Sequence, residues 1–303
     1  MKDEIIVFLK SLQINICNQL SGIDGKAVFS EEIWNREEGG GGITRVIQDG
    51  NVFEKGGVNF SAVHGKAPEF LLNEKQHSAI ENTGPDLNFF ATGLSIVIHP
   101  VNPFVPIIHM NIRYFEMNDG TKWFGGGIDL TPHYVNVTEA GFFHRELKKI
   151  CDNHHPTYYA KFKKWADDYF FIVHRKETRG IGGIFFDRLQ GNDVNMQKIF
   201  EFWKDTGKIF APVYTQLVNS NKGKAYNEEN KRWQLLRRGR YVEFNLVYDK
   251  GTKFGLETNG RTESILMSLP KFASWEYNVN FSEDSLESKT LSYLKKGIDF
   301  INY

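Results

Sequence analysis

Three polar residues alternate with apolar ones in the segment 92–116, and they are the first candidates for chemistry. His109, Asn111 and Arg113 lie two residues apart, so in a strand their side chains point to one face. By the same rule, one face of the preceding strand carries Ser95, Val97 and His99. The residues that would face the core are Ile108, Met110, Ile112 and Tyr114. The pattern therefore predicts one polar face and one core face. By pattern alone, an antiparallel strand with a merely solvated face is the commoner outcome; the alternative is a face that binds a ligand.

A glycine-rich segment supplies the next candidate. Residues 123–132 read WFGGGIDLTP, and consecutive glycines let another backbone or a flat ligand approach closely. Asp129 follows them directly, either as a carboxylate facing a pocket or as an ordinary turn or cap acid. Arg261 follows Asn259 and Gly260, a turn signal that could present its guanidinium to a carboxylate; the alternative is a surface arginine.

Histidine and cysteine spacing limits the metal chemistry. The chain has nine histidines but no H-E-x-x-H pattern or other close helical pair, so a histidine metal site could form only through the fold. Histidines in such positions are more often structural than metal ligands. The histidines in question are His99, His109, His144 and His174. The two cysteines, Cys17 and Cys151, form no C-x-x-C pattern, which argues against a disulfide framework, a thiolate zinc site and an iron–sulfur cluster.

Composition is that of an ordinary globular protein. Of 303 residues, 41% are hydrophobic and 24% charged, and Lys+Arg and Asp+Glu both number 37. This balance gives no case for a nucleic-acid partner or an anionic membrane. No apolar run approaches the roughly 18–20 residues that span a bilayer, and the N-terminal segment predicts an amphipathic helix and not a signal peptide. A reducing cytoplasm is the expected location.

The remaining pattern predicts the elements that position these residues. Apolar spacing indicates helices over 5–20 and 138–150, a third that begins at Thr157, and a long one over 199–217 that Pro212 could kink. Extended segments are expected at 43–63, 92–116, 181–187, 240–249 and 264–269. Strands and helices cluster without regular alternation, which predicts an α+β fold with a mainly antiparallel sheet. We expect residues 1–303 to form a single domain.

Long sequence blocks in a fixed order add a family resemblance. The blocks are K-G-G-V-N-F-S at 55–61, G-x-S-I-V-I-H-P at 93–100, V-P-x-x-H-x-N-x-R at 105–113, W-F-G-G-G-x-D-L-T-P at 123–132, D-D-Y-F-F at 167–171, H-R-x-E-x-R-G-I-G-G-x-F-F-D at 174–187, R-R-G-R-Y-V-E-F-N-L-V-Y-D at 237–249 and G-R-T-E-S-I-L-M-S-L-P at 260–270. Together they cover nearly the whole chain and resemble the aerobic, oxygen-dependent coproporphyrinogen III oxidases.

The resemblance implies a fold and a reaction. The expected fold is a large antiparallel sheet with helices on both faces, in a homodimer supported by the region 241–276. The expected reaction converts two propionates of coproporphyrinogen III into vinyl groups, giving protoporphyrinogen IX in haem biosynthesis. Molecular oxygen is the acceptor, carbon dioxide and hydrogen peroxide leave, and no flavin, haem or nicotinamide takes part.

The resemblance also implies roles for particular residues. His109 is similar to a proposed proton donor, and Asp129 to an acid that meets the pyrrole N–H groups and helps one of them lose its proton. The expected substrate-binding residues are Ser95, Asn111, Arg113, Asn259, Gly260 and Arg261. Asn259 departs from the glycine usual at its position, although asparagine also tolerates positive φ. The residues that resemble proposed ligands of a divalent metal such as manganese are His99, His109, His144 and His174.

Two rival functions remain open from sequence. A non-enzymatic tetrapyrrole binder would be expected to lack the polar face that carries His109, Asn111 and Arg113. A metal-dependent hydrolase would be active without oxygen. The oxygen-independent radical route to the same product is excluded by the missing cluster cysteines.

Overall fold

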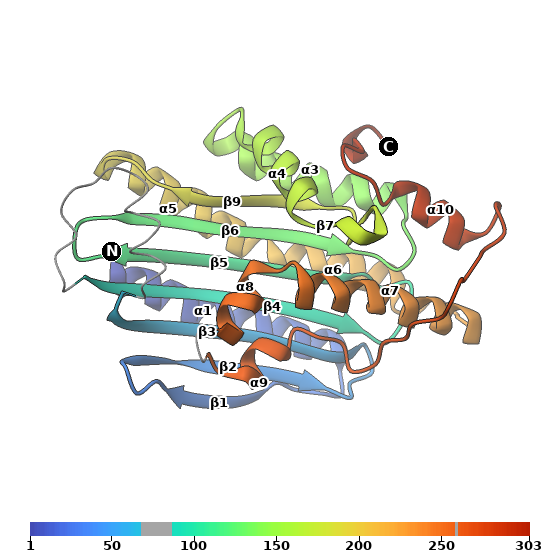
Figure 1. The fold of residues 1–303 in the computed structure, drawn as a ribbon, viewed down its shortest axis with the longest axis horizontal. Coiled ribbons are helices and arrows are strands. Elements are labelled where there is room, and N and C mark those ends of the chain that lie inside the picture. The colour runs from blue at the N-terminus through green and yellow to red at the C-terminus, as the bar shows by residue number, and fades with distance from the viewer. Residues whose placement is uncertain (68–86, 258–259) are drawn as a thin grey trace.

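A seven-stranded antiparallel sheet forms the centre of the molecule (Figure 1). The computed structural model describes residues 1–67, 87–257 and 260–303. Neighbouring strands follow the order β1-β2-β3-β4-β5-β6-β9. Their bounds are β1 Ser30–Asn35, β2 Gly40–Gln48, β3 Phe53–Lys66, β4 Asn88–Pro100, β5 Ile107–Met117, β6 Lys122–Thr131 and β9 Gly183–Leu189.

Helices cover both faces of this sheet. Figure 1 shows one set behind the sheet: α1 (Lys2–Asp24), α5 (Asp193–Lys208) and α6 (Phe210–Asn221). On the front, as the molecule is drawn there, lie α7 (Glu228–Val247), α8 (Lys250–Glu257) and α9 (Thr262–Leu266). The predicted α+β class, with helices on both faces of an antiparallel sheet, is confirmed.

The other elements lie beyond β9 and near the C-terminus. Helix α4 (Tyr158–Tyr169) packs on β9, and α3 (Val137–His154) packs on α4 and α5. A small second sheet pairs β7 (Phe171–Ile172) with β8 (Glu177–Thr178). The short remaining elements are η1 (Val173–Arg175), α10 (Leu286–Tyr293) and η2 (Phe300–Asn302).

Strand β5 shows how the sequence separates core from site. Ile108, Met110 and Ile112 are fully buried in the main core, which includes residues of α1 and α5. Burial of such side chains stabilises the fold by about 1.5–3 kcal/mol each. The side chains between them point to the front and stay partly exposed. The two-residue alternation thus places the polar face where the sequence predicted it.

The strands predicted at 240–249 and 264–269 are wrong, because both segments lie in or next to helices. Residues 240–247 belong to α7, whose buried residues Tyr241, Phe244 and Asn245 follow the i, i+3, i+4 spacing of a helix. Asn227 begins α7 with a capping box, which favours helix from that point. Residues 264–266 complete α9.

Two other helix boundaries also differ from the prediction. The long helix expected over 199–217 is divided at Ile209 into α5 and α6. Pro212 lies in the first turn of α6, where its missing N–H costs little. The N-cap of α3 is Asn136 and not Thr138, since the Asn136 side chain accepts hydrogen bonds from two backbone N–H groups.

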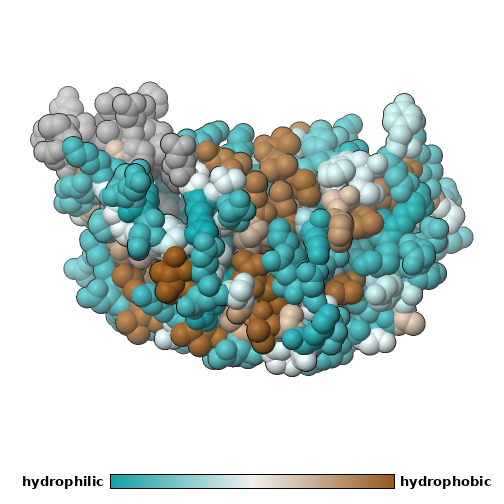
Figure 2. Space-filling view, turned by 90° about the horizontal axis from the view of Figure 1, so that it is seen from below, coloured by the Kyte–Doolittle hydropathy of each residue, from teal (hydrophilic) through white to brown (hydrophobic). Residues whose placement is uncertain are grey.

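Strand β1 is one of the two outer strands of the sheet. Figure 2 views the molecule from this side and shows apolar residues interspersed with hydrophilic ones. Ile33 of β1 is 70% exposed, and its neighbours Glu31 and Glu32 are charged; charged side chains on an outer strand discourage pairing with other chains. In the described ranges, no helix is both long and apolar enough to cross a bilayer.

Candidate functional site

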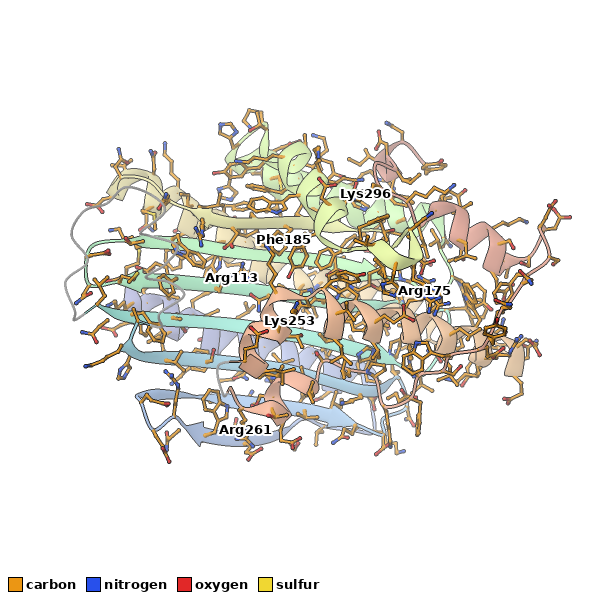
Figure 3. All side chains as sticks on the ribbon, in the orientation of Figure 1. Arg113, Arg175, Phe185, Lys253, Arg261 and Lys296 are labelled. Carbon is orange, nitrogen blue, oxygen red and sulfur yellow. The ribbon has the colours of Figure 1, made fainter. Side chains whose placement is uncertain are left out.

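The front of strands β4, β5 and β6 forms a floor with few side chains. Ser95 lies opposite Asn111, and Asn111 lies opposite Gly127, in one row across the three strands. The next row joins Gly93, Arg113 and Gly125. Because the glycines add no side chains, side chains of the neighbouring strands can lie close over their backbone, as Phe185 does at Gly127. Figure 3 shows Arg113 and Phe185 projecting from this face, in the part of the view that also holds Lys253 of α8.

Arg113 is held in place by two partners. Its Nη2 lies 3.0 Å from Oδ1 of Asp187, and its Nη1 donates to Oδ1 of Asn111 at 3.1 Å. The Arg113 side chain remains 33% exposed, so the guanidinium is accessible from the front. A Cβ on Gly125 would lie 2.5 Å from the Asp187 carboxylate and 3.0 Å from Nε of Arg113. Glycine at this position is what lets the pair lie across β6.

A second polar centre joins β5, β6 and the loop before β9. Nδ1 of His109 lies 2.7 Å from Oδ1 of Asp129. Nη2 of Arg179 donates to both oxygens of the same carboxylate, at 2.9 and 2.8 Å. Burial raises the pKa of Asp129, but the Arg179 charge and the His109 hydrogen bond outweigh it and hold that pKa below its usual range. The centre therefore contains an ionised carboxylate between a cation and an imidazole.

The geometry separates the roles of His109 and Asp129. Asp129 is 1% exposed, whereas the His109 side chain is 19% exposed. An ionised carboxylate only accepts hydrogen bonds, so Nδ1–H of His109 is the donor. Nε2 of His109 has no hydrogen-bond partner within the described residues. Nε2 of His109 is therefore available to bind a ligand.

The alternative role of Asp129 as a turn acid does not fit. Asp129 lies inside β6, directly opposite His109 on one side and Gly183 on the other. Its oxygens bind side chains from other elements and not the backbone of a turn. The structure also does not place its oxygens on the open floor, because His109 and Arg179 already engage them.

The predicted substrate loop lies apart from this centre. Arg261 precedes α9 and forms an ion pair with Glu32 of β1. Since β1 and β5 are four strand spacings apart, this pair lies roughly 19 Å across the sheet from the strand of His109. Gly260 approaches the backbone of Gly255, to whose carbonyl its N–H donates at 2.8 Å. Asn259 lies outside the described residues.

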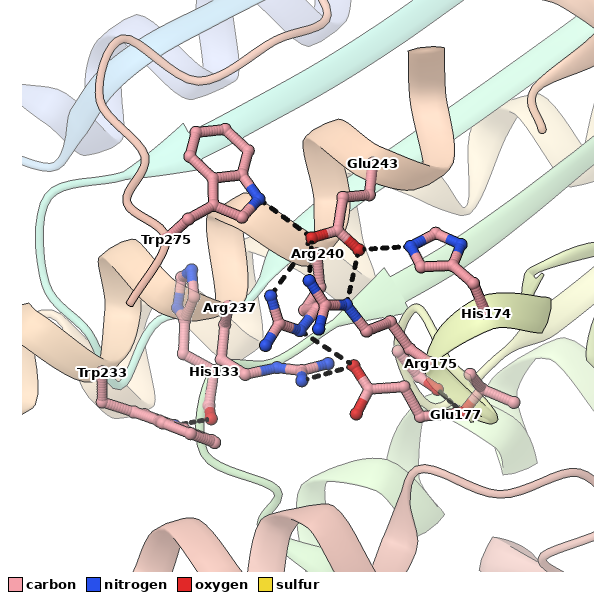
Figure 4. Close-up of polar contacts among 11 residues, drawn as sticks. His133, His174, Arg175, Glu177, Trp233, Arg237, Arg240, Glu243 and Trp275 are labelled. Atoms are coloured by element: carbon pink, nitrogen blue, oxygen red, sulfur yellow. Dashed lines mark hydrogen bonds and ion pairs between the residues drawn. The ribbon is translucent and has the colours of Figure 1, made fainter. Parts of the chain in front are cut away.

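The four histidines considered for a metal do not come together. His144 is buried on α3, with Nε2 bonded to the carbonyl of Ile181 and Nδ1 to the hydroxyl of Tyr159. Both ring nitrogens of His174 are engaged as well, at 2.7 Å each, by Tyr248 and by Glu243. Figure 4 shows the contact with Glu243.

The remaining two histidines each have a protein partner at one ring nitrogen. Nε2 of buried His99 contacts the carbonyl of Ser268, and Nδ1 of His109 is bonded to Asp129. Within the described part of the chain, no three His, Cys, Asp or Glu side chains are arranged to hold a metal ion. These residues therefore do not fit a shared metal.

Comparison with known proteins decides the family. The family model described as coproporphyrinogen III oxidase matches residues 4–300. The chain belongs to the coproporphyrinogen III oxidase family. It is 50% identical to the mitochondrial oxygen-dependent coproporphyrinogen-III oxidase of Rattus norvegicus, over 100% of this chain and 69% of the relative. It is 48% identical to the oxygen-dependent enzyme of Drosophila melanogaster, over 99% and 78%. The chloroplastic coproporphyrinogen-III oxidase 1 of Arabidopsis thaliana is 47% identical, over 93% and 75%.

The family assignment made from the sequence blocks is thus confirmed. In this member of the coproporphyrinogen III oxidase family, the fold brings together Ser95, His109, Asn111, Arg113 and Asp129. Two charged residues of the site, Arg179 and Asp187, were not predicted from the sequence. Both fall inside the block at 174–187, so the block was the available signal, although nothing in its spacing points to either partner.

Proposed function

We propose that the glycine-rich floor in front of β4, β5 and β6 is where coproporphyrinogen III binds and reacts. The chain is an oxygen-dependent coproporphyrinogen III oxidase of haem biosynthesis, an oxidoreductase. This placement rests on the pairing of His109 with a buried, ionised Asp129. Arg113, whose guanidinium is partly exposed, lies four residues further along β5. The His109–Asp129 pair can exchange a proton, and Arg113 can bind a carboxylate.

The stoichiometry of the reaction supports a proton donor at this place. One propionate carboxylate, one O₂ and one proton give a vinyl group, CO₂ and H₂O₂. The C–CO₂ bond and one C–H bond break, and their electrons reduce O₂ to peroxide. Each turnover therefore takes up a proton. The open Nε2 of His109 can first accept this proton from solvent and then pass it on, because the ionised Asp129 balances the charge of the protonated ring. Asp129 keeps the opposite nitrogen protonated, so we propose that it acts through His109 and not directly on a pyrrole.

The remaining floor residues position the substrate. Arg113 can bind a propionate with charge-assisted hydrogen bonds, for which the carboxylate must compete with Asp187. Ser95 and Asn111 supply neutral hydrogen-bonding groups between the two charged centres. We further propose that Asn259, Gly260 and Arg261 contribute to binding once Arg261 exchanges Glu32 for a substrate carboxylate.

We propose that the reaction requires no organic cofactor and no metal. The porphyrinogen is itself electron-rich and can react with oxygen once a pyrrole N–H is lost. The protein then supplies orientation, charge placement and exclusion of water. His144 and His174 use both ring nitrogens in hydrogen bonds within the protein, which supports this proposal.

We also propose a homodimer that uses the region 241–276. The strand expected at 240–249 would have placed Val242, Phe244, Leu246 and Tyr248 on one apolar face. In the helix that forms instead, Phe244 is fully buried and Leu246 is 45% exposed. Apolar side chains in this region are nevertheless exposed, and a second subunit could cover them. They are Leu246, Val247, Leu256, Phe272 and Trp275. Light scattering should give about twice the chain mass of 34.9 kDa; a monomer at micromolar concentration would contradict the proposal.

The activity is tested by incubating the purified protein with coproporphyrinogen III in air and under argon. Without added cofactor, protoporphyrinogen IX should appear only in air, as chromatography of the oxidised porphyrins would show. Equal conversion under argon would contradict the use of molecular oxygen, and no conversion in either gas would favour a tetrapyrrole binder. A cytoplasmic location is likewise a proposal, which imaging of the tagged protein in its own cells would test.

A further inference from the structure

Arg179 occupies an aromatic cage behind the His109–Asp129 pair. Its guanidinium carbon lies 4.4, 4.6 and 4.7 Å from the ring centres of Phe170, Tyr241 and Phe244. Nη1 donates to Oδ1 of Asn245 at 2.8 Å, and the side chain is only 3% exposed. A cation enclosed in this way has its orientation fixed from several sides.

The loop that carries Arg179 is fitted closely to β6. The Arg179 backbone N–H donates to the carbonyl of Phe170 at 2.8 Å. A Cβ on Gly180 would lie 2.3 Å from the carbonyl oxygen of Leu130, so glycine is required for this approach. The segment 179–183 thus places the guanidinium against Asp129 with little freedom to move.

We infer that Arg179 is a positioning residue, which sets the tautomer of His109 by holding Asp129 as a fixed, ionised carboxylate. Without a cation beside it, a carboxylate this deeply buried would favour its neutral form. A neutral carboxyl could donate a proton to Nδ1 of His109 instead of accepting one. The imidazole would then carry its hydrogen on Nε2, and the nitrogen facing the floor would have lost its lone pair. This inference rests on the proposed role of His109 but concerns the state of its ring.

Arg179→Gln is the informative variant, because it removes the charge that holds Asp129 ionised but keeps a polar side chain. We expect kcat to fall by about 10–100-fold, the size of a small misplacement of a reacting group, with KM within about threefold. Arg237→Gln is the matched control. Arg237 is also a buried arginine, 2.7 Å from its carboxylate partner Glu177 (Figure 4), but Asp129 is not among its partners.

The decisive readout is the ¹⁵N NMR spectrum of the histidine rings, with the His109 signal assigned by its loss in His109→Asn. The wild type and Arg237→Gln should show a protonated Nδ1 and a bare Nε2. Arg179→Gln should show a mixture of tautomers or the reverse one. An unchanged His109 signal in folded Arg179→Gln overturns the inference, whatever the activity. If that variant does not fold, Arg179→Met, which fills the aromatic cage without a charge, is measured in its place, with the same expected and overturning results. Lack of turnover by the wild type would reject the proposed function and leave this measurement valid.

Discussion

Arg113 and Asp187 form an ion pair 3.0 Å long across a glycine of the intervening strand. The pair fixes the arginine on the floor before any ligand arrives. Its partner is itself 28% exposed, so the pair is not deeply desolvated, and a substrate carboxylate can replace Asp187 without first exposing a buried charge. Pre-ordering of this kind lowers the entropy cost of binding.

Arg113→Ala should therefore weaken substrate binding more than it slows chemistry. Loss of one partner of a hydrogen-bonded charge pair at an interface typically costs about 2–5 kcal/mol, which would appear mainly as a higher KM. Steady-state kinetics with coproporphyrinogen III would measure it. Arg232→Ala is the control, because Arg232 is an exposed arginine of α7 paired with Glu276 and should change neither constant. A normal KM in Arg113→Ala would remove the residue from binding.

The sequence predicted some of this site and missed the rest for identifiable reasons. The front and back of β5 were predictable because a strand alternates every two residues, and the core side is uniformly apolar. Helix α7 was mistaken for a strand because its buried face includes Arg238 and Asn245, whose polar groups find partners across the fold. Apolar periodicity cannot reveal a buried polar face.

The sequence also failed to predict charge pairs between residues that are far apart along the chain. Arg179 and Asp129 are 50 positions apart, and no local spacing relates them. The block containing Arg179 matched the family, but a matched block does not say which of its residues meets which partner. The carboxylate of Asp129 was consequently expected to meet the substrate directly, whereas its oxygens face His109 and Arg179.

Asp129→Asn keeps the shape of the side chain and removes its charge. Asparagine can still accept from His109, but its amide can also donate, so the ring loses its fixed orientation. Loss of an acid–base group commonly costs about 10²–10⁴-fold in rate, and we expect the effect on kcat with little change in KM. A melting curve is needed alongside, since an unpaired Arg179 would also destabilise the fold. A folded variant with near-normal kcat would exclude Asp129 from the mechanism.

Metal removal should leave most of the activity intact. Of the four histidines considered as ligands, His144 and His174 already use both ring nitrogens within the protein. The measurement is activity after treatment with a chelator and gel filtration, followed by titration with manganese. Strict dependence of the rate on added manganese would show that these side chains rearrange around a metal.

His144 should make the stability of the fold depend on pH. Burial lowers the pKa of this imidazole from its usual 6.5 to about 4, although its hydrogen bond to the Ile181 carbonyl acts in the other direction. Between these values the unfolded chain binds a proton that the folded protein refuses, so the unfolding free energy falls as the pH falls from about 6.5 to about 4. The full difference corresponds to roughly 3 kcal/mol.

His144→Gln isolates this contribution, because glutamine offers a donor to Ile181 and an acceptor to Tyr159 without titrating. Urea unfolding at several values between pH 7 and pH 4.5 should show a shallower loss of stability in His144→Gln than in wild type. His155 is an exposed histidine one residue beyond α3, so His155→Gln should follow the wild-type curve and serves as the control. If His144→Gln loses stability as steeply as wild type, the buried imidazole is not the group that the folded state keeps neutral.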